Sequence, residues 1–404
     1  LFLWFPLSIG MIDALNTRLA EGVSYQHIIM LVFPIYAIIK AAQSPSIYLI
    51  RNIYFYSIFF FMLIHSLFIS RSTDTFFRLF LYFGSAQWAY YIVKKLDQSE
   101  FFDIIASSAA IFLIASIIFG FIFPSASFEE LQGKNGMSSF YGHKNSYGRF
   151  LQISSLIFFS ALIVNKQLKW LSLLVISFCI LYFLTASRTS FYIAVIGSCV
   201  GILTFLRYFT SLKALCICVT VSLIVWVGTI TGDVYSYRIG SIYDGVSIFG
   251  LNIDLTGRIT VWNSLLNYLS LEKLFLFGNG YGDFFNSTAN IAASDIGIGD
   301  FIPNDAHNGY VDTLVSFGII GLLVFLSFLL SCFIKFKNIH NTNPSLAIFS
   351  LPFIFCFIFV NLTEAYIIKT TNIYSFLIWC LYFSDWKQIS THYSDESSVI
   401  VAKK

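Results

Sequence analysis

The amino-acid sequence predicts an all-α membrane protein, a polytopic bundle of about twelve transmembrane helices with one long, mostly helical loop outside the membrane. Only 11% of the 404 residues are charged, whereas soluble domains average about 25%. Hydrophobic residues make up 57% of the chain and form long runs that short polar segments separate. One polar segment, 231–308, is much longer than the others and is the natural place for a functional site.

The spanning helices are predicted from apolar runs of about 20 residues, or fewer where neighbouring helices shield them. They lie near residues 25–39, 52–70, 75–93, 102–123, 148–165, 167–185, 190–206, 212–230, 309–334, 346–366 and 372–384. The run from Leu1 to Ile9 is too short to span, and we expect it to be the end of a first helix whose start precedes this sequence. The chain therefore divides into N-terminal helices (1–230), the long loop (231–308), C-terminal helices (309–384) and a tail (385–404).

The orientation in the membrane is predicted from Lys and Arg in the short loops, because these residues are retained on the cytoplasmic side. Five pairs fall in alternate loops: Lys40 and Arg51, Lys94 and Lys95, Lys166 and Lys169, Arg207 and Lys213, and Lys335 and Lys337. Arg71, Lys134, Lys144 and Lys369 fall on the other side. The pattern predicts cytoplasmic termini and outer loops at 11–24, 71–74, 124–147, 186–189, 231–308 and 367–371.

The long loop contains an amphipathic helix that is predicted to begin near Arg258. Apolar residues recur at helical spacing in Ile259, Trp262, Leu265, Leu266 and Leu269, which is typical of a helix at the membrane surface. A cation in the first turn opposes the helix dipole, so another group should hold Arg258 there. Arg258 and the free N–H groups of that turn suit an anion such as phosphate, and an Arg that extends to lipid headgroups is the alternative.

His307 lies at the far end of the loop, just before the next apolar run. Residues 303–310 have the composition of a helix start, with Asn304 or Asp305 as the expected cap. The helix dipole disfavours imidazolium there, and neutral imidazole is the form that a general base requires. Asp305 or Asp312 could orient the ring. The alternative is a simple polar residue at the membrane boundary.

Other polar residues fall on the predicted outer side. Arg188 lies in a tight turn at headgroup height, which suits a lipid-linked phosphate and equally a lipid anchor. His143, Lys144 and Asn145, with Arg149, lie at the mouth of a helix; they suit pyrophosphate or sugar hydroxyls, and a solvated loop is the alternative. Glu364 is an acid near the outer end of a helix and should face a cavity or a cation.

Several classes of function are not supported. The net charge of +3 is too small to indicate a nucleic-acid partner, and the seven cysteines all fall in apolar runs, so disulfides and structural zinc are not expected. The glycine-rich segment 278–282 follows no strand of a nucleotide-binding unit and is predicted to be a turn near the membrane surface. The outer loops contain no cluster with metal-ligand spacing. No metal or cofactor is predicted.

The order of these motifs resembles the O-antigen ligase and polymerase family of bacterial envelope polysaccharide assembly. The matching features are the turn at 187–189, Gly257 and Arg258 with Trp262, the turn at 278–282, and the stretch 306–308 that leads into 315–322. Together they cover roughly residues 140 to 370, and the first 120 residues resemble the family only in hydropathy.

The resemblance implies a GT-C-like glycosyltransferase on the outer face of the bacterial inner membrane, with a glycan donor on undecaprenyl pyrophosphate, no metal, and inversion at the anomeric carbon. It implies that Arg188 and Arg258 hold the pyrophosphate and that His307 is the general base. We further predict that His143, Lys144, Asn145, Trp262, Asn308 and Glu364 contact the substrate. The acceptor is a second lipid-linked repeat in a polymerase, which we favour from residues 142–148, or lipid A core in a ligase. Membrane lipids are further partners, and a chain-length regulator is a candidate one. A flippase is the remaining alternative, although no internal repeat is visible.

Overall fold

The structure is a computed structural model, and it describes a defined part of the chain. The described residues are 18–20, 23–70, 73–131, 134–141, 144–165, 167–185, 187–206, 233–236, 244–248, 251–254, 258–281, 306–368 and 373–386. The predicted spans at 1–9 and 212–230 lie outside these residues. All statements below concern the described part.

Apolar helices coincide with every predicted span in the described part. They are α2 (Tyr25–Gln43), α4 (Ile53–His65) with η2 (Ser66–Ser70), α5 (Thr73–Lys95), α6 (Gln98–Ile122), α8 (Lys144–Asn165), α9 (Leu168–Cys179) with η4 (Ile180–Leu184), α10 (Arg188–Phe205), α14 (Gly309–Thr342), α15 (Pro344–Val360) and α16 (Ile373–Phe383). Local signals set several boundaries: Asp97 and Glu100 form a capping box before α6, and Pro344 opens α15.

Three helical segments among the described residues are long and apolar enough to cross a membrane, namely 98–122, 145–164 and 309–336. Shorter apolar helices surround them, with many side chains exposed on the outside of the bundle, such as Ile53, Phe121 and Phe183. Such a surface is unfavourable in water and favourable against lipid tails. The chain has the helices of an integral membrane protein.

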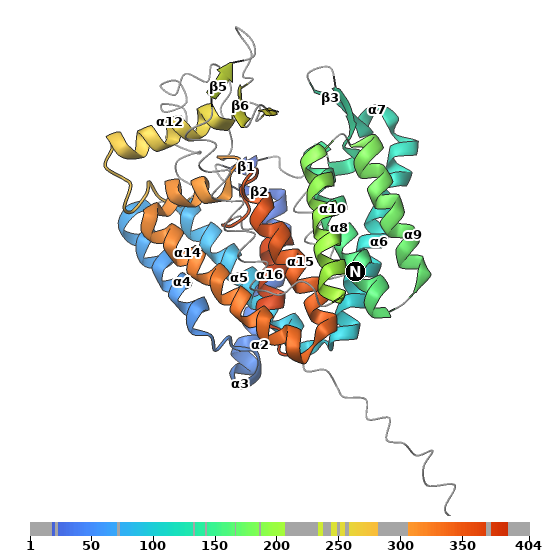
Figure 1. The fold of residues 1–404 in the computed structure, drawn as a ribbon. Coiled ribbons are helices and arrows are strands. Elements are labelled where there is room, and N and C mark those ends of the chain that lie inside the picture. The colour runs from blue at the N-terminus through green and yellow to red at the C-terminus, as the bar shows by residue number, and fades with distance from the viewer. Residues whose placement is uncertain are drawn as a thin grey trace, which may run out of the picture.

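The helices form two groups that α15 joins (Figure 1). In one group α8 packs against α6, α9 and α10, and in the other α5 packs against α2 and α16 while α4 contacts α14. Helix α15 contacts α8 and α10 on one side and α14 and α16 on the other. The segments that precede α14 and follow α15 therefore lie at the junction of the two groups.

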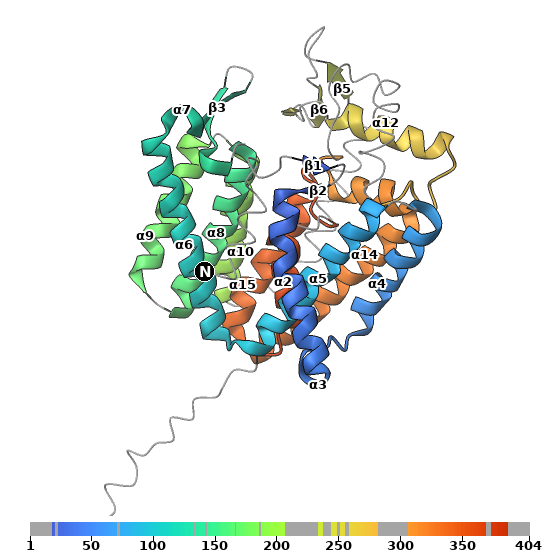
Figure 2. The same cartoon turned by 180° about the vertical axis from the view of Figure 1, so that it is seen from behind.

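The described parts of the predicted outer loops lie toward one end of the bundle, and α3 (Pro45–Tyr48) lies at the opposite end (Figures 1 and 2). The outer-loop elements are β1 (Arg18–Ala20), β2 (Val23–Ser24), α7 (Pro124–Ser127), β3 (Phe128–Leu131), β4 (Lys134–Met137), β5 (Asp233–Ser236), β6 (Asp244–Ile248), β7 (Leu251–Asp254) and α12 (Arg258–Leu271). This separation agrees with the alternation of basic residues along the chain.

The described residues of the long loop include strands that we did not predict. Its described residues before α12 form an antiparallel sheet in the order β5-β6-β7, in which Val246 pairs with Val234 on one side and Ile253 on the other. The residues of β7 alternate apolar and polar side chains, a period of two that fits a strand. The helix predicted from Arg258 is present as α12, and its apolar face packs on the start of α14 through Trp262 and Leu265.

Helix α14 is interrupted at Gly318, where φ is 67° and ψ is −170°. The segment 274–281 fills this break: Asn279 N–H donates to Val315 O at 2.8 Å, and Ile319 N–H donates to Phe275 O at 2.9 Å. A Cβ atom on Gly318 would lie 2.2 Å from Leu276 O, so only glycine fits. The predicted turn at 278–282 is thus one structural unit with the break in α14, called the α14 clasp below.

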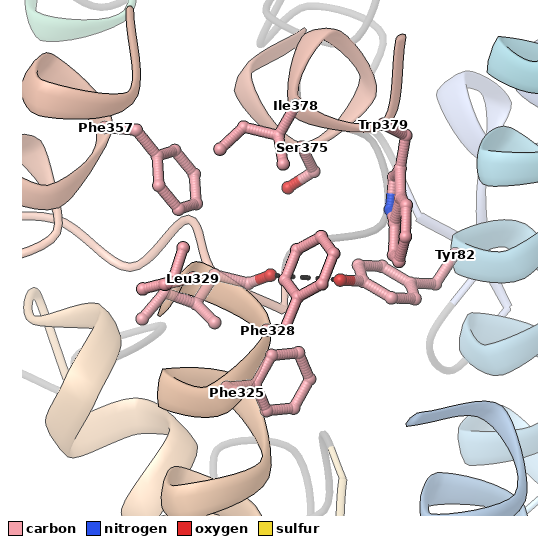
Figure 3. A pocket seen from close by; sticks show the side chains of 9 residues that line it. Tyr82, Phe325, Phe328, Leu329, Phe357, Ser375, Ile378 and Trp379 are labelled. Atoms are coloured by element: carbon pink, nitrogen blue, oxygen red, sulfur yellow. Dashed lines mark hydrogen bonds between the residues drawn. The ribbon is translucent and has the colours of Figure 1, made fainter. Parts of the chain in front are cut away.

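A small internal cavity lies between α5, α14, α15 and α16 (Figure 3). Its walls are mainly aromatic and aliphatic: Tyr82, Phe325, Phe328, Leu329, Phe357, Ile367, Ser375, Ile378 and Trp379. The Tyr82 hydroxyl donates a hydrogen bond of 3.4 Å to Ile367 O. No charged side chain lines this cavity, so it lacks the groups that glycosyl transfer requires.

Candidate functional site

Four charged or titratable side chains meet at the end of the bundle that carries α12. Arg149 Nη2 lies 2.6 Å from Glu364 Oε2, and Arg258 Nη2 lies 3.4 Å from Glu364 Oε1. His307 Nδ1 lies 3.9 Å from Glu364 Oε2. The side chain of Glu364 is only 11% exposed. We call Arg149, Arg258, His307 and Glu364 the polar cluster.

The members of the polar cluster come from segments that are far apart in sequence. Arg149 lies early in α8, Arg258 is the first residue of α12, His307 precedes α14 and Glu364 follows α15. Helices α8, α10, α12 and α14 all begin at this end, so their positive dipole ends face the same region (Figure 1). Two guanidinium groups and several helix N-termini surround a single carboxylate, an arrangement that favours a bound anion.

Hydrogen bonds join the chain segment that follows His307 to the segment that carries Glu364. The N–H of Gly309 donates to Asn361 O at 2.8 Å and to Glu364 O at 2.9 Å, and Asn308 Nδ2 donates to Leu362 O at 3.2 Å. A Cβ atom on Gly309 would lie 2.1 Å from Asn361 Oδ1. The start of α14 therefore lies directly against the segment that carries Glu364.

His307 has a left-handed backbone conformation with φ of 47°, which is uncommon outside glycine, although histidine, asparagine and aspartate adopt it more often than other residues. The N-cap of α14 is Asn308, whose side chain accepts from the N–H groups of Tyr310 and Val311. We predicted Asn304 or Asp305 as the cap, and these two residues lie outside the described part. The turn at His307 allows the helix to begin later, at Gly309.

Glu364 Oε2 lies 3.9 Å from His307 Nδ1, so this acid can orient the ring. Asp312, one of the two acids that we predicted to orient this ring, accepts a hydrogen bond of 3.4 Å from the N–H of Ala306. Trp262 Nε1 donates to Ala306 O at 2.8 Å. Both contacts position the residue before His307. The sequence analysis singled out Glu364 but did not pair it with His307, because no local pattern relates residues so far apart in the chain.

Trp262 and Asn308, which we predicted to contact substrate, are both buried. The indole N–H of Trp262 and both groups of the Asn308 amide make the structural hydrogen bonds described above. Trp262 and Asn308 therefore lie at the site. The hydrogen bonds of the Trp262 indole and the Asn308 amide position His307 and α14.

Arg188 begins α10, beside the polar cluster. Gly148 in α8 packs so closely on Ser187 that an added Cβ would lie 2.6 Å from Ser187 Cβ, which places the backbone of Arg188 next to the first turns of α8. The side chains of Arg188 and Lys144 and all of His143 lie outside the described part, and Asn145 lies in the first turn of α8. Three of the predicted residues, Arg258, His307 and Glu364, are thus shown in direct proximity.

The pKa of Glu364 reflects opposing effects. Burial raises the pKa of this carboxyl, but the charge of Arg149, the neighbouring His307 imidazole and the charge of Arg258 together hold the pKa well below its usual range. The carboxylate is therefore ionised at neutral pH. An ionised group beside Nδ1 favours the imidazole tautomer with hydrogen on Nδ1, which leaves Nε2 as the basic nitrogen.

Comparison with known families decides the relationship. Residues 171–326 match the family model described as O-antigen ligase. The match supports the assignment of this segment to the O-antigen ligase/polymerase family. The match confirms the resemblance predicted from the motifs, and it includes Arg188, Arg258, His307 and the α14 clasp. No curated relative matches the chain.

The family assignment gives the polar cluster a chemical context. Members of the O-antigen ligase/polymerase family are glycosyltransferase-like enzymes that act on lipid-linked glycans. Arg149 and Glu364 lie outside the matched segment, on opposite sides of it, and the fold brings both to the residues within it. Arg149 was part of the basic stretch at 142–149, but nothing in the sequence identified Glu364 as its partner.

Proposed function

We propose that this protein is a metal-independent, inverting glycosyltransferase that polymerises undecaprenyl-pyrophosphate-linked oligosaccharide repeats into O-antigen, capsule or exopolysaccharide. The observation that carries the proposal is the meeting of Arg258 and His307 around the buried carboxylate of Glu364. It joins a group that binds anions to a group that accepts protons. A transfer reaction with a pyrophosphate leaving group and a hydroxyl acceptor needs both.

The donor would bind with its pyrophosphate on Arg258 and Arg188, near the start of α12 and α10. Guanidinium groups form strong, directional hydrogen bonds with phosphate oxygens. Negative charge increases on the pyrophosphate as its bond to the anomeric carbon breaks, so fixed cations there stabilise the transition state more than the ground state. Helix N-termini contribute in the same direction.

His307 would act as the general base. The acceptor hydroxyl oxygen attacks the anomeric carbon from the face opposite the pyrophosphate, its proton passes to His307 Nε2, and undecaprenyl pyrophosphate leaves with the bonding electron pair. One displacement of this kind inverts the anomeric configuration. Glu364 beside Nδ1 would stabilise the imidazolium that forms.

The outer face of the bacterial inner membrane is the proposed place of reaction. The polar cluster lies at the end of the bundle toward which the outer-loop elements lie, and the loop between Lys40 and Arg51 lies at the other end (Figure 2). The positive-inside rule then puts the polar cluster outside and both chain termini in the cytoplasm. The long loop is periplasmic in this arrangement.

Glycan profiles of cells that lack the protein test the proposal. The cells are complemented with wild type or His307→Asn at matched expression; asparagine tolerates the left-handed conformation at this position, so the substitution removes the imidazole with little backbone strain. We expect wild type to restore long chains and His307→Asn not to restore them. A normal profile with His307→Asn would contradict the catalytic role of His307.

A ligase is the alternative enzyme, and the description of the matching family model favours it. The two activities leave different products in the deletion strain. A polymerase defect leaves single repeats on lipid A core, whereas a ligase defect leaves lipid A core bare while long lipid-linked polymer accumulates. Two results together would support a flippase. In the deletion strain, lipid-linked repeats accumulate on the cytoplasmic face, and complementation with His307→Asn gives the same products as wild type.

A further inference from the structure

We propose that Arg149 is a positioning residue that acts through Glu364 on His307, whereas Arg258 is the arginine of the polar cluster that binds the donor. This inference rests on the proposed function of His307 and Arg258. It assigns different roles to two arginines that share one carboxylate. The geometry around Glu364 separates them.

Arg149 is held more tightly than Arg258. Its Nη2 atom lies 2.6 Å from Glu364 Oε2, against 3.4 Å between Arg258 Nη2 and Glu364 Oε1. The guanidinium of Arg149 also lies over the ring of Tyr366, 5.1 Å from its centroid. The N–H of Tyr366 donates to Asn361 Oδ1 at 2.8 Å, which fixes the segment that carries this ring. Arg149 therefore has two fixed partners.

The supporting elements differ in the same way. Arg149 belongs to α8, a long buried helix that packs on α6, α9, α10 and α15. Arg258 is the first residue of α12, which contacts α14 and the loop sheet. A phosphate that enters from the outer side can take Arg258 from its longer contact with Glu364, while Arg149 stays paired.

Glu364 connects Arg149 to His307. Its Oε2 atom lies 2.6 Å from Arg149 Nη2 and 3.9 Å from His307 Nδ1. Among the described side chains, the charged and titratable groups that face Glu364 are Arg149 from α8, Arg258 from α12 and His307 before α14. If Arg258 moves to the donor, Arg149 is the arginine among the described contacts that stays on Glu364. The carboxylate then remains ionised and continues to orient His307.

The first test separates turnover from donor binding. The full-length protein is assayed in nanodiscs with lipid-linked glycan extracted from cells that lack it. We expect Arg149→Met to lower kcat about tenfold or more with a donor KM within about threefold of wild type, and Arg258→Met to raise donor KM about tenfold or more. Arg149→Lys keeps the charge and should recover part of the lost kcat.

The second test is the pH dependence of kcat. Arg149 is the largest of the influences that lower the pKa of Glu364, so Arg149→Met should raise that pKa. The carboxylate is present above its pKa and is lost as pH falls through it, so activity of Arg149→Met should decline at a higher pH than activity of wild type. Glu364→Gln, which lacks the carboxylate, should have low kcat without this shift of the decline to higher pH. A purely structural role would lower activity equally at every pH.

Different results would contradict the positioning role of Arg149 and the proposed function. Asp385→Asn and Lys94→Met alter a charged group at the opposite end and should match wild type. If Arg149→Met fails to fold, Arg149→Lys and Glu364→Gln carry the same comparison. A donor KM raised equally by Arg149→Met and Arg258→Met would make Arg149 a donor ligand, and unchanged kcat and pH dependence would also overturn the positioning role. Full activity of His307→Asn would instead overturn the proposed function.

Discussion

Two clusters at opposite ends of the bundle combine the same kinds of charge in different surroundings. In the polar cluster, Glu364 contacts Arg149, Arg258 and His307, and its side chain is 11% exposed. At the other end, Asp385 lies 3.5 Å from Lys94 Nζ and 3.3 Å from Lys335 Nζ, and its side chain is 70% exposed. Each cluster joins one acid to at least two basic groups.

Exposure decides what each cluster can do. Water and ions screen the Asp385 cluster, so it contributes little, and neutral hydrogen bonds fasten that end instead: Asn343 Nδ2 donates to Gln98 Oε1 at 2.6 Å and to Trp386 O at 2.9 Å. Around Glu364 the lower dielectric strengthens every charge interaction and shifts the pKa. Of the two clusters, only the buried one keeps its charged groups in fixed positions with little screening, as a reaction requires.

The largest expected difference comes from removing each acid. Glu364→Ala leaves Arg149 and Arg258 largely buried without their carboxylate, so we expect the free energy of unfolding to fall by about 3 kcal/mol and glycan polymer to disappear. Asp385→Ala should cost less than about 1 kcal/mol and leave activity intact. Thermal unfolding in detergent and the glycan profile measure both effects. Equal costs for the two substitutions would contradict the comparison.

Substitution in the α14 clasp should have the next largest effect, because the clasp supports only the end of the bundle that carries the polar cluster. Gly318→Ala puts a Cβ atom against Leu276 O and forces an unfavourable φ, with an expected cost of about 1–3 kcal/mol. Gly120→Ala is the matched control, since its Cβ would meet the terminal methyl of Met137, which can move. The melting temperature of Gly318→Ala should be lower than that of Gly120→Ala. Equal melting temperatures would show that a side chain at position 318 does not strain the clasp.

A smaller effect is expected from the hydrogen bond that precedes His307. Trp262→Phe keeps an aromatic ring but removes the donor to Ala306 O, at a cost of about 1–2 kcal/mol. We expect kcat to fall while donor KM is maintained. Trp170→Phe is the control, because Trp170 Nε1 has no hydrogen-bond partner among the described residues. Identical kinetics for the two variants would remove Trp262 from the positioning of His307.

Salt should produce the smallest effect, and only at the exposed end. A double-mutant cycle of Lys94→Met and Asp385→Asn should give a coupling of less than about 1 kcal/mol that vanishes near 1 M salt, where the Debye length is about 3 Å. The cycle of Arg149→Met and Glu364→Gln should keep most of its coupling. Loss of both couplings with salt would show that the two ends are equally solvated.

Much of the fold and part of the site could be predicted from local patterns. Apolar runs located the helices, and helical spacing after Arg258 located α12. Expected helix starts in the long polar loop identified Arg258 and His307, and a charge in an apolar run identified Glu364. The sheet β5-β6-β7 was missed because short alternating strands give a much weaker pattern than a long helix.

The sequence by itself determined the membrane class, the helices of the described part and the resemblance to a family, because hydrophobicity, helix periodicity and ordered motifs are properties of neighbouring residues. The tertiary structure alone decided that Arg149 pairs with Glu364 across 215 positions of the chain. It also decided that a turn after α12 completes a broken α14, and that one acid is buried and another exposed. These features depend on packing between distant segments, and the free energy of a charge depends on that packing more than on its neighbours in sequence.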